Sequence, residues 1–106
     1  MDIDTIRELL RQGKYATTRE FHRRGDRRGF SLSDAQIVVE VGSVIEERPD
    51  GTLCPKCTIS GVISRDVAGV VIRDELHIGI ALYDDVVFIT GYWKNDRPRR
   101  KKVGKQ

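Results

Sequence analysis

Four charged residues near the N-terminus have the spacing of one helical face. They are Glu20, Arg24, Arg27 and Arg28. Separations of three, four and eight positions place them along one side of an α-helix. A carboxylate beside guanidinium groups can move a proton and hold a phosphate, as RNA cleavage requires. An exposed helix with internal ion pairs, each worth roughly a few tenths of a kcal/mol, has the same spacing, so both interpretations stay open.

His77 lies in a segment where apolar residues alternate with other residues. In a strand its neighbours Leu76 and Ile78 point to the opposite face, and Gly79 on its own face leaves room for a substrate. A neutral imidazole near pH 7 can accept or donate a proton. A hydrogen-bonded structural histidine beneath the helices is the alternative, because the alternation does not decide which face is buried.

A cysteine pair, Cys54 and Cys57, has the spacing of half a structural zinc site. Such a site needs four ligands, and His22 and His77 stand at no standard spacing from the pair. A redox role would need the first cysteine at a helix start, whereas this pair leads into an expected strand. We therefore expect two buried or half-buried thiols, no metal site and no cofactor.

Aromatic and basic residues meet near the C-terminus. Tyr92 and Trp93 precede Lys94. The basic residues that follow include Arg99, Arg100 and Lys101. Aromatic rings beside cations suit stacking on the bases of single-stranded RNA. Core or rim packing is the alternative for a tryptophan at a strand end.

The length of 106 residues fits one domain with a core of its own. No apolar run approaches the length of a membrane span, and the acidic start Met1-Asp2-Ile3-Asp4 is unlike a signal peptide. Two cysteines exclude a disulfide framework. We therefore expect a cytoplasmic protein with no membrane partner.

The net charge of +3 is unevenly distributed. Six of the 19 Lys and Arg residues lie in the segment 97–106, which leaves 13 of them against 16 acidic residues in the first 96. Within that acidic body, the segment Lys14 to Arg28 holds six basic and two acidic residues. Positive charge focused in two places favours a polyanion such as RNA as a partner, although solvated surface charge is the alternative.

Three helices are expected before the strands begin. Apolar residues at helical spacing predict a helix over residues 3–12. A hydroxyl residue followed three positions later by a carboxylate predicts two more helix starts, at Thr17 and at Ser31. The first of these helices is expected over about residues 18–28, and the second is expected to end at Gly42.

The pattern then changes to that of strands. The expected strands run from Val44 to a turn at 48–52, over 56–63, over 70–83 and over 86–93. Residues 65–69 form the tip of an extra hairpin in this scheme. Helices followed by strands predict an α+β domain over residues 1–96, with two to three N-terminal helices packed on a four-stranded antiparallel sheet. The basic tail 97–106 is expected to be disordered.

Six short motifs occur in a fixed order between residues 14 and 94. They are Thr18 with Arg24, Arg28, Gly29 and Phe30; Gly42 to Glu47; Pro49-Asp50; Pro55 to Gly61; Leu76-His77-Ile78; and Ile89 to Tyr92. Their order resembles domain-of-unknown-function family 4258, a family of small bacterial and archaeal proteins. The family's helix histidine corresponds to Glu20, and His22 lies about 200° farther round the helix. The extra hairpin is an insertion relative to the family.

The resemblance implies a fold of the barnase, colicin and RelE toxin type. It also implies a toxin that cleaves RNA without a metal ion and has an antitoxin protein as its partner. In this first hypothesis, His77 or Glu20 takes the ribose 2′ proton, while Arg24 and Arg28 stabilise the charge on the phosphorane. The residues expected to hold the RNA are Arg27, Tyr92, Lys94, Arg99, Arg100 and Lys101.

A second hypothesis keeps the scaffold without the chemistry. The protein would then be a non-catalytic RNA-binding or protein-interaction module, with the basic tail as its electrostatic contact. Glu20 distinguishes the two hypotheses, because it stands where the family has a histidine.

Overall fold

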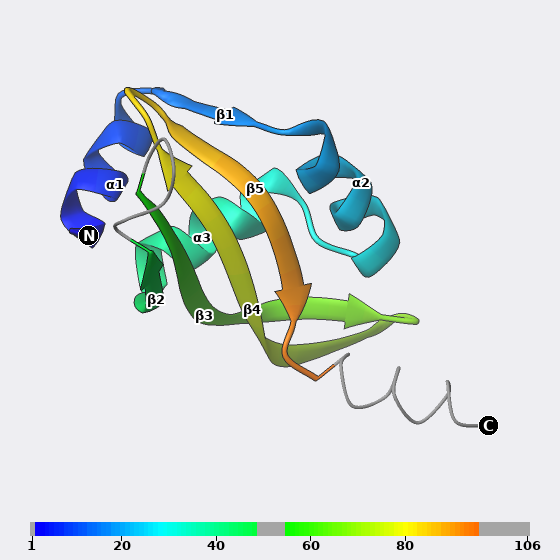
Figure 1. The fold of residues 1–106 in the computed structure, drawn as a ribbon. Coiled ribbons are helices and arrows are strands. Elements are labelled where there is room, and N and C mark those ends of the chain that lie inside the picture. Colours follow the sequence, from blue (N-terminus) through cyan, green and yellow to red (C-terminus); the bar gives the residue numbers. More distant parts are fainter. Residues whose placement is uncertain (1, 49–54, 96–106) are drawn as a thin grey trace.

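The computed structural model describes residues 2–48 and 55–95, and it shows an α+β fold with helices packed on one sheet (Figure 1). The helices are α1 (Ile3–Arg11), α2 (Arg19–Arg28) and α3 (Leu32–Val41). The strands are β1 (Tyr15–Thr17), β2 (Ser43–Arg48), β3 (Lys56–Val67), β4 (Val70–Leu82) and β5 (Val86–Trp93). Within these described ranges no helix is long and apolar enough to cross a membrane.

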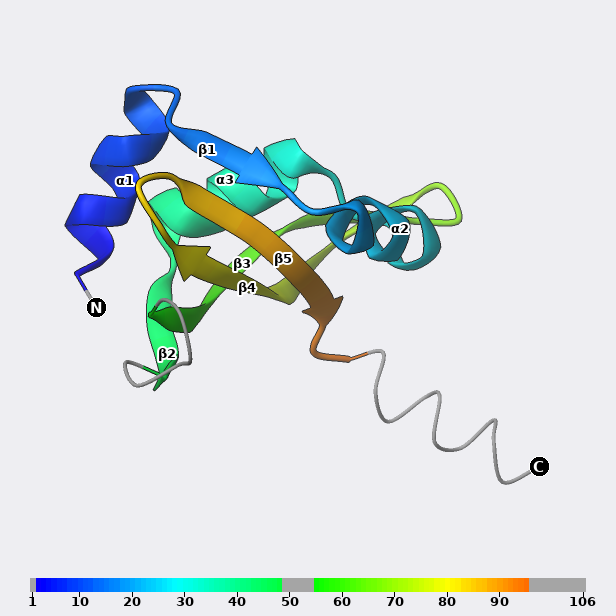
Figure 2. The ribbon, with the colours of Figure 1, turned by 45° about the horizontal axis from the view of Figure 1, so that its top comes forward.

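The sheet has five strands in the order β1-β5-β4-β3-β2. β2, β3, β4 and β5 pair antiparallel, whereas β1 pairs with β5 in parallel, from Tyr15 opposite Val86 to Thr17 opposite Phe88 (Figure 2). The expectation of a four-stranded antiparallel sheet is therefore wrong. A strand of three residues is too short to show an alternating pattern, so its sequence carried no strand signal.

Capping residues position α2 and α3. Thr18, one residue later than expected, is the N-cap of α2: its hydroxyl accepts a hydrogen bond from the Phe21 backbone N–H at 3.1 Å and donates one to the Ile89 carbonyl at 3.2 Å. Ser31 and Asp34 form the expected capping box of α3. Gly29 ends α2 with a φ of 80°, a left-handed conformation that suits glycine. These caps fix where the charged face of α2 begins and ends.

A close approach explains Gly25 inside α2. A Cβ atom at this position would lie 2.6 Å from the backbone oxygen of Phe30. The Gly29 and Phe30 backbone N–H groups both donate to the Gly25 carbonyl, which folds the chain tightly back on the helix. Glycine costs a helix about 1 kcal/mol relative to alanine. Glycine occupies position 25 despite this loss of stability because no larger residue fits there.

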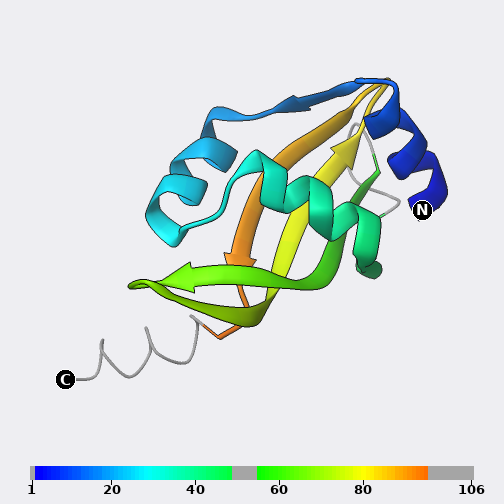
Figure 3. The same cartoon turned by 180° about the vertical axis from the view of Figure 1, so that it is seen from behind.

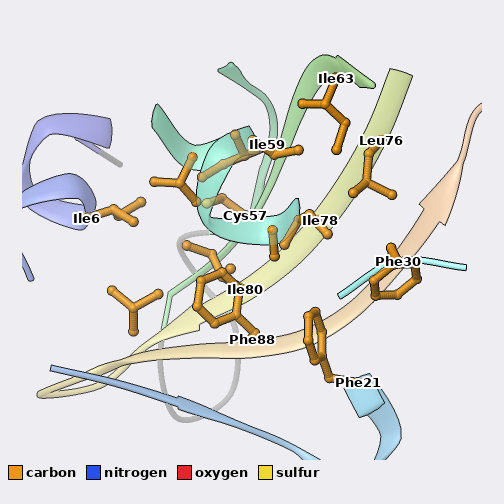
Figure 4. Close-up of a cluster of buried hydrophobic side chains, with 14 of the residues drawn as sticks. Ile6, Phe21, Phe30, Cys57, Ile59, Ile63, Leu76, Ile78, Ile80 and Phe88 are labelled. Carbon is orange, nitrogen blue, oxygen red and sulfur yellow. The ribbon is translucent and has the colours of Figure 1, made fainter. Parts of the chain in front are cut away.

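The core lies between the helices and one face of the sheet (Figures 3 and 4). α3 crosses that face, and buried side chains from all three helices meet buried residues of the strands. They include Ile6, Phe21, Val38, Ile59, Ile78, Phe88 and Trp93. The Trp93 indole N–H donates to the Arg28 carbonyl at 2.9 Å, which ties the end of β5 to the end of α2.

β3 and β4 form one long hairpin, paired from Lys56 opposite Ala81 to Val67 opposite Val70. β5 pairs with β4 only from Leu76 onward, so the outer part of the hairpin extends beyond the sheet. This part is the extra hairpin expected from the sequence. A buried ion pair at 2.8 Å between Arg65 and Asp74 lies at its base.

No helix of the described residues covers the opposite face of the sheet. We call it the open face and define it by two neighbouring cross-strand rows. The first row is Ser60, His77 and Tyr92, and the second is Thr58, Gly79 and Thr90. Leu76 and Ile78 are fully buried on the helix side, so His77 lies on the open face and not beneath the helices.

Candidate active site

Both ring nitrogens of His77 are hydrogen-bonded on the open face. Nε2 lies 2.6 Å from Glu75 Oε2, and Nδ1 lies 3.1 Å from the Tyr92 hydroxyl. The His77 and Tyr92 rings also pack against each other, with centroids 4.9 Å apart. The position on the middle strands of the sheet and these contacts hold the imidazole in one orientation.

The Glu75 carboxylate anchors this group. Its Oε2 atom accepts a hydrogen bond from the Ser60 hydroxyl at 2.8 Å as well as the contact from His77. Oε1 lies 3.8 Å from the Lys94 ammonium group. The hydrogen bonds from Ser60 and His77 hold the pKa of Glu75 below its ordinary value. Glu75 is therefore an anion near neutral pH.

The ionised carboxylate determines the direction of the hydrogen-bond chain. A carboxylate accepts hydrogen bonds and donates none, so the proton of a neutral His77 ring is on Nε2. Nδ1 is then an acceptor for the Tyr92 hydroxyl. The result is a chain from Tyr92 through His77 to Glu75, in which a base oriented by a carboxylate contacts a hydroxyl group.

α2 brings a second charged group to the open face. Glu20 Oε2 lies 2.6 Å from Arg24 Nε, and a second guanidine nitrogen of Arg24 donates to the Thr90 hydroxyl at 3.2 Å. Thr90 lies in the row next to His77 and Tyr92. The structure therefore brings Arg24 to the same face as His77, through Thr90.

Glu20 is poorly suited to act as a base. The hydrogen bond from Arg24 is the largest of the effects that hold the pKa of Glu20 below its ordinary value. Its other carboxylate oxygen lies 3.3 Å from Arg23. An anion so paired holds the Arg24 guanidinium in place and has a low affinity for a proton.

The other basic residues of α2 have different environments. Arg28 donates a hydrogen bond at 2.6 Å to the Gly91 carbonyl, so its guanidinium lies along β5. Arg27 is exposed on the helix. His22 is also exposed, and its Nε2 lies 2.6 Å from the Thr17 hydroxyl. The helical face predicted from spacing thus splits into Arg24 and Arg28, which contact β5, and Arg27, which is exposed.

Lys94 provides a cation at the other end of the site. Its side chain is 63% exposed, while its backbone N–H donates to the Glu75 carbonyl at 2.9 Å. The ammonium group is therefore beside the carboxylate but accessible to a ligand. The predicted RNA contacts Arg99, Arg100 and Lys101 lie outside the described residues, as does the expectation of a disordered tail.

Cys54, the first cysteine of the pair, belongs to the segment 49–54, which lies outside the described residues. The turn predicted at Pro49-Asp50 belongs to the same segment. Cys57 is buried, and burial raises the pKa of its thiol to about 11. Such a thiol is an inert core residue. Among the described residues, no three His, Cys, Asp or Glu side chains lie together as a metal site.

Three residues of the site were missed from the sequence. Glu75 lies two positions before His77, and that spacing alone places both side chains on one face of a strand. Ser60 and Thr90 reach the site by cross-strand pairing, which depends on register between separate strands. A short sequence signal therefore existed for Glu75 but not for Ser60 and Thr90.

Comparisons with family models, with curated proteins and with solved structures found no match to this chain.

Proposed function

We propose that this protein binds single-stranded RNA on the open face and cleaves it without a metal ion. The observation that carries the proposal is the hydrogen-bond chain from Tyr92 through His77 to Glu75, which pairs a hydroxyl group with an oriented base. Arg24 and Lys94 provide positive charge on the two sides of this chain. Cations and an aromatic ring suit a phosphodiester strand with stacked bases.

The proposed reaction is attack of a ribose 2′-hydroxyl on the adjacent phosphorus atom. The 2′ proton passes to the Tyr92 oxygen while Tyr92 gives its own proton to His77 Nδ1, and Glu75 stabilises the imidazolium that forms. Arg24 stabilises the negative charge on the phosphorane. The bond from phosphorus to the 5′-oxygen breaks, and Lys94 gives a proton to that oxygen. The products are a 2′,3′-cyclic phosphate and a 5′-hydroxyl end.

Glu20 has a positioning role in this proposal. Its ion pair with Arg24 keeps the guanidinium directed at Thr90. In this proposal His77 acts as the base, in place of the histidine that the family has at the position of Glu20. The motif order that resembles family 4258 supports the proposal, since the resemblance implies a RelE-type toxin fold and RNA cleavage without metal. An antitoxin partner and a cytoplasmic location belong to the same proposal.

End-labelled single-stranded RNA of mixed sequence, incubated in EDTA, tests the reaction. We expect wild type to produce fragments with cyclic phosphate ends, and His77→Ala and Arg24→Ala to lose cleavage by about 10²-fold or more. His22→Ala is the matched control, because His22 is exposed on α2 and lies outside the chain of Tyr92, His77 and Glu75. It should cleave as wild type does.

Two results would overturn the proposed reaction. One is cleavage that persists unchanged in His77→Ala, and the other is intact RNA with every variant. Intact RNA that is retained by the protein and released by salt would instead favour the non-catalytic RNA-binding module. The pairing of Glu20 with Arg24 favours this second function, because it lowers the pKa of Glu20 and makes the carboxylate a poor base.

A further inference from the structure

A groove of about 230 Å³ lies on the open face next to the His77 row. Its lining includes Thr58, Gly79 and Thr90, the three residues of the second row. Residues two apart along a strand are separated by about 7 Å. The groove is therefore one residue pair away from the proposed reacting centre, which is where a neighbouring nucleotide of the same strand would lie.

An irregularity in β2 turns Glu46 into the groove. The register of β2 with β3 shifts between Val44 and Glu46, so that Val44 pairs with Ile59 and Glu46 pairs with Thr58. Ile45 is the extra residue. Without this bulge Ile45 would lie opposite Thr58, and Glu46 would move to the face of the buried Cys57. The bulge thus places a carboxylate at a groove that would otherwise have an apolar side chain.

A second irregularity, in β5, provides the apolar part of the groove. The register of β5 with β4 shifts so that Thr90 pairs with Gly79 and Phe88 pairs with Ile80, which leaves Ile89 as the extra residue lining the groove. A Cβ atom on Gly79 would lie 2.8 Å from the Thr90 methyl group. The Thr90 methyl group therefore lies over Gly79, and together with Ile89 it gives the groove an aliphatic wall that suits a flat ring.

The polar groups of the groove have a definite hydrogen-bonding character. The Glu46 carboxylate is 59% exposed and accepts a hydrogen bond from the Thr58 hydroxyl at 3.4 Å. Arg48 lies 4.0 Å from its other oxygen, and Lys56 also lines the groove. The groove thus presents an acceptor with two oxygens beside two cationic donors.

We propose that this groove is a nucleobase site that selects guanine. Guanine has two adjacent donors, N1–H and the N2 amino group, which match the two oxygens of Glu46, and its O6 acceptor suits Arg48 or Lys56. Adenine, cytosine and uracil lack two adjacent donors on this edge. Ile89 and the Thr90 methyl group contact the ring face. The inference rests on the proposed function, since it makes the groove the specificity site of the same RNA strand.

Fluorescence polarisation with short oligouridines tests the site directly. Each oligomer carries one central guanosine, adenosine or cytidine, and 2′-O-methyl groups block cleavage. We expect wild type to bind the guanosine oligomer about tenfold or more tightly than the adenosine oligomer. Glu46→Gln should reduce this preference to a few-fold. Glu47→Gln is the matched control, because Glu47 is the next residue of β2 and does not line the groove, and it should keep the preference.

The outcomes separate this inference from the cleavage proposal. Equal affinity for the three oligomers, or a guanine preference unchanged in Glu46→Gln, would overturn the inference even if the RNA is cleaved. A Glu46-dependent preference supports the inference even if unmodified RNA stays intact. GMP and AMP serve as competitors: a guanine preference seen with GMP and with none of the oligomers would overturn RNA as the source of the base.

Discussion

His77 shows how a single side chain acquires a role from its neighbours. Glu75 and Tyr92 engage its two ring nitrogens, and Ser60 fixes the carboxylate of Glu75. Each of these contacts limits the rotation of the imidazole. A base held in this way needs little reorganisation when a proton arrives, which is the condition for efficient general base catalysis.

Removing one oxygen atom tests whether Tyr92 relays the proton. Tyr92→Phe keeps the ring beside His77 but loses the hydroxyl, so we expect RNA cleavage to fall by about 10²-fold or more. RNA binding should change little, because the aromatic face is retained. Tyr83→Phe, the same change at an exposed tyrosine in the turn after β4, is the control for both assays. Cleavage at the wild-type rate in Tyr92→Phe would mean that His77 acts without the relay.

Glu75 makes the free energy of unfolding depend on pH in the acid range. Its pKa is lowered from 4.5 in the folded protein, so its stabilising contribution is present above about pH 4.5 and is lost as the pH falls through the folded pKa. We expect Glu75→Gln to lower the free energy of unfolding by about 1 kcal/mol at pH 7. The difference from wild type should shrink below pH 4.5 in urea denaturation curves recorded across the acid range.

The matched control for this experiment is Asp84→Asn, at an exposed turn. It should be close to wild type throughout. A difference between Glu75→Gln and wild type that grows in acid would contradict the assignment of a lowered pKa.

At the residue scale, the sequence showed that His77 could act as a base and left its face undecided. Alternation placed Leu76 and Ile78 together, but burial of that pair depends on where the helices pack. The partners Ser60 and Tyr92 come from other strands, and their positions follow from register. Local pattern therefore pointed to His77 as a candidate base and could not identify the residues that hold it.

α2 is the element that connects the two halves of the site. Its N-cap hydroxyl bonds to β5 at Ile89, and Arg24 and Arg28 bond to the same strand at Thr90 and Gly91. Polar contacts therefore run along the whole helix, while Phe21 packs in the core beneath it. The helix is held in register with β5, so any shift of α2 would move Arg24.

Gly25 tests the packing of this helix. By helix propensity alone, Gly25→Ala would stabilise α2 by about 1 kcal/mol. We expect the opposite, a loss of about 1–3 kcal/mol, because the added methyl group would lie 2.6 Å from the Phe30 backbone oxygen. Urea denaturation of the variant measures the change in the free energy of unfolding.

Asp26→Ala, at the exposed neighbouring position, is the control and should differ from wild type by less than about 0.5 kcal/mol. An increase in stability in Gly25→Ala would show that the chain at Phe30 can move away from the helix.

Among the elements, the helices were the most predictable. The capping residue Ser31 and the left-handed Gly29 act on backbone groups a few positions away, so the helix ends can be predicted from short stretches of sequence. β1 could not be predicted, because its three residues become a strand through pairing with Val86 to Phe88 at the far end of the chain. Distance in sequence is the physical reason for this failure.

For the whole molecule, the distribution of charge is the property to test. Six cationic residues lie in the segment 97–106, after an acidic body. Deletion of residues 97–106 should weaken RNA binding and reduce the slope of log affinity against log salt by up to about 4, if all six contact phosphates. Cleavage of RNA at saturating protein should persist in this variant, because the proposed site lies within residues 20–94.

A charge-neutral version of the same segment, with its six basic residues replaced by glutamine, is the control for chain length. It should reproduce the deletion. Unchanged salt dependence in both variants would show that RNA contacts the body alone.

The parallel pair of β1 and β5 also sets an order of events during synthesis. Residues 15–17 are made long before their strand partner at residues 86–88. Thr90 and Gly91, which position Arg24 and Arg28, follow immediately after. A nascent chain therefore cannot assemble the site before residues 86–91 have been made.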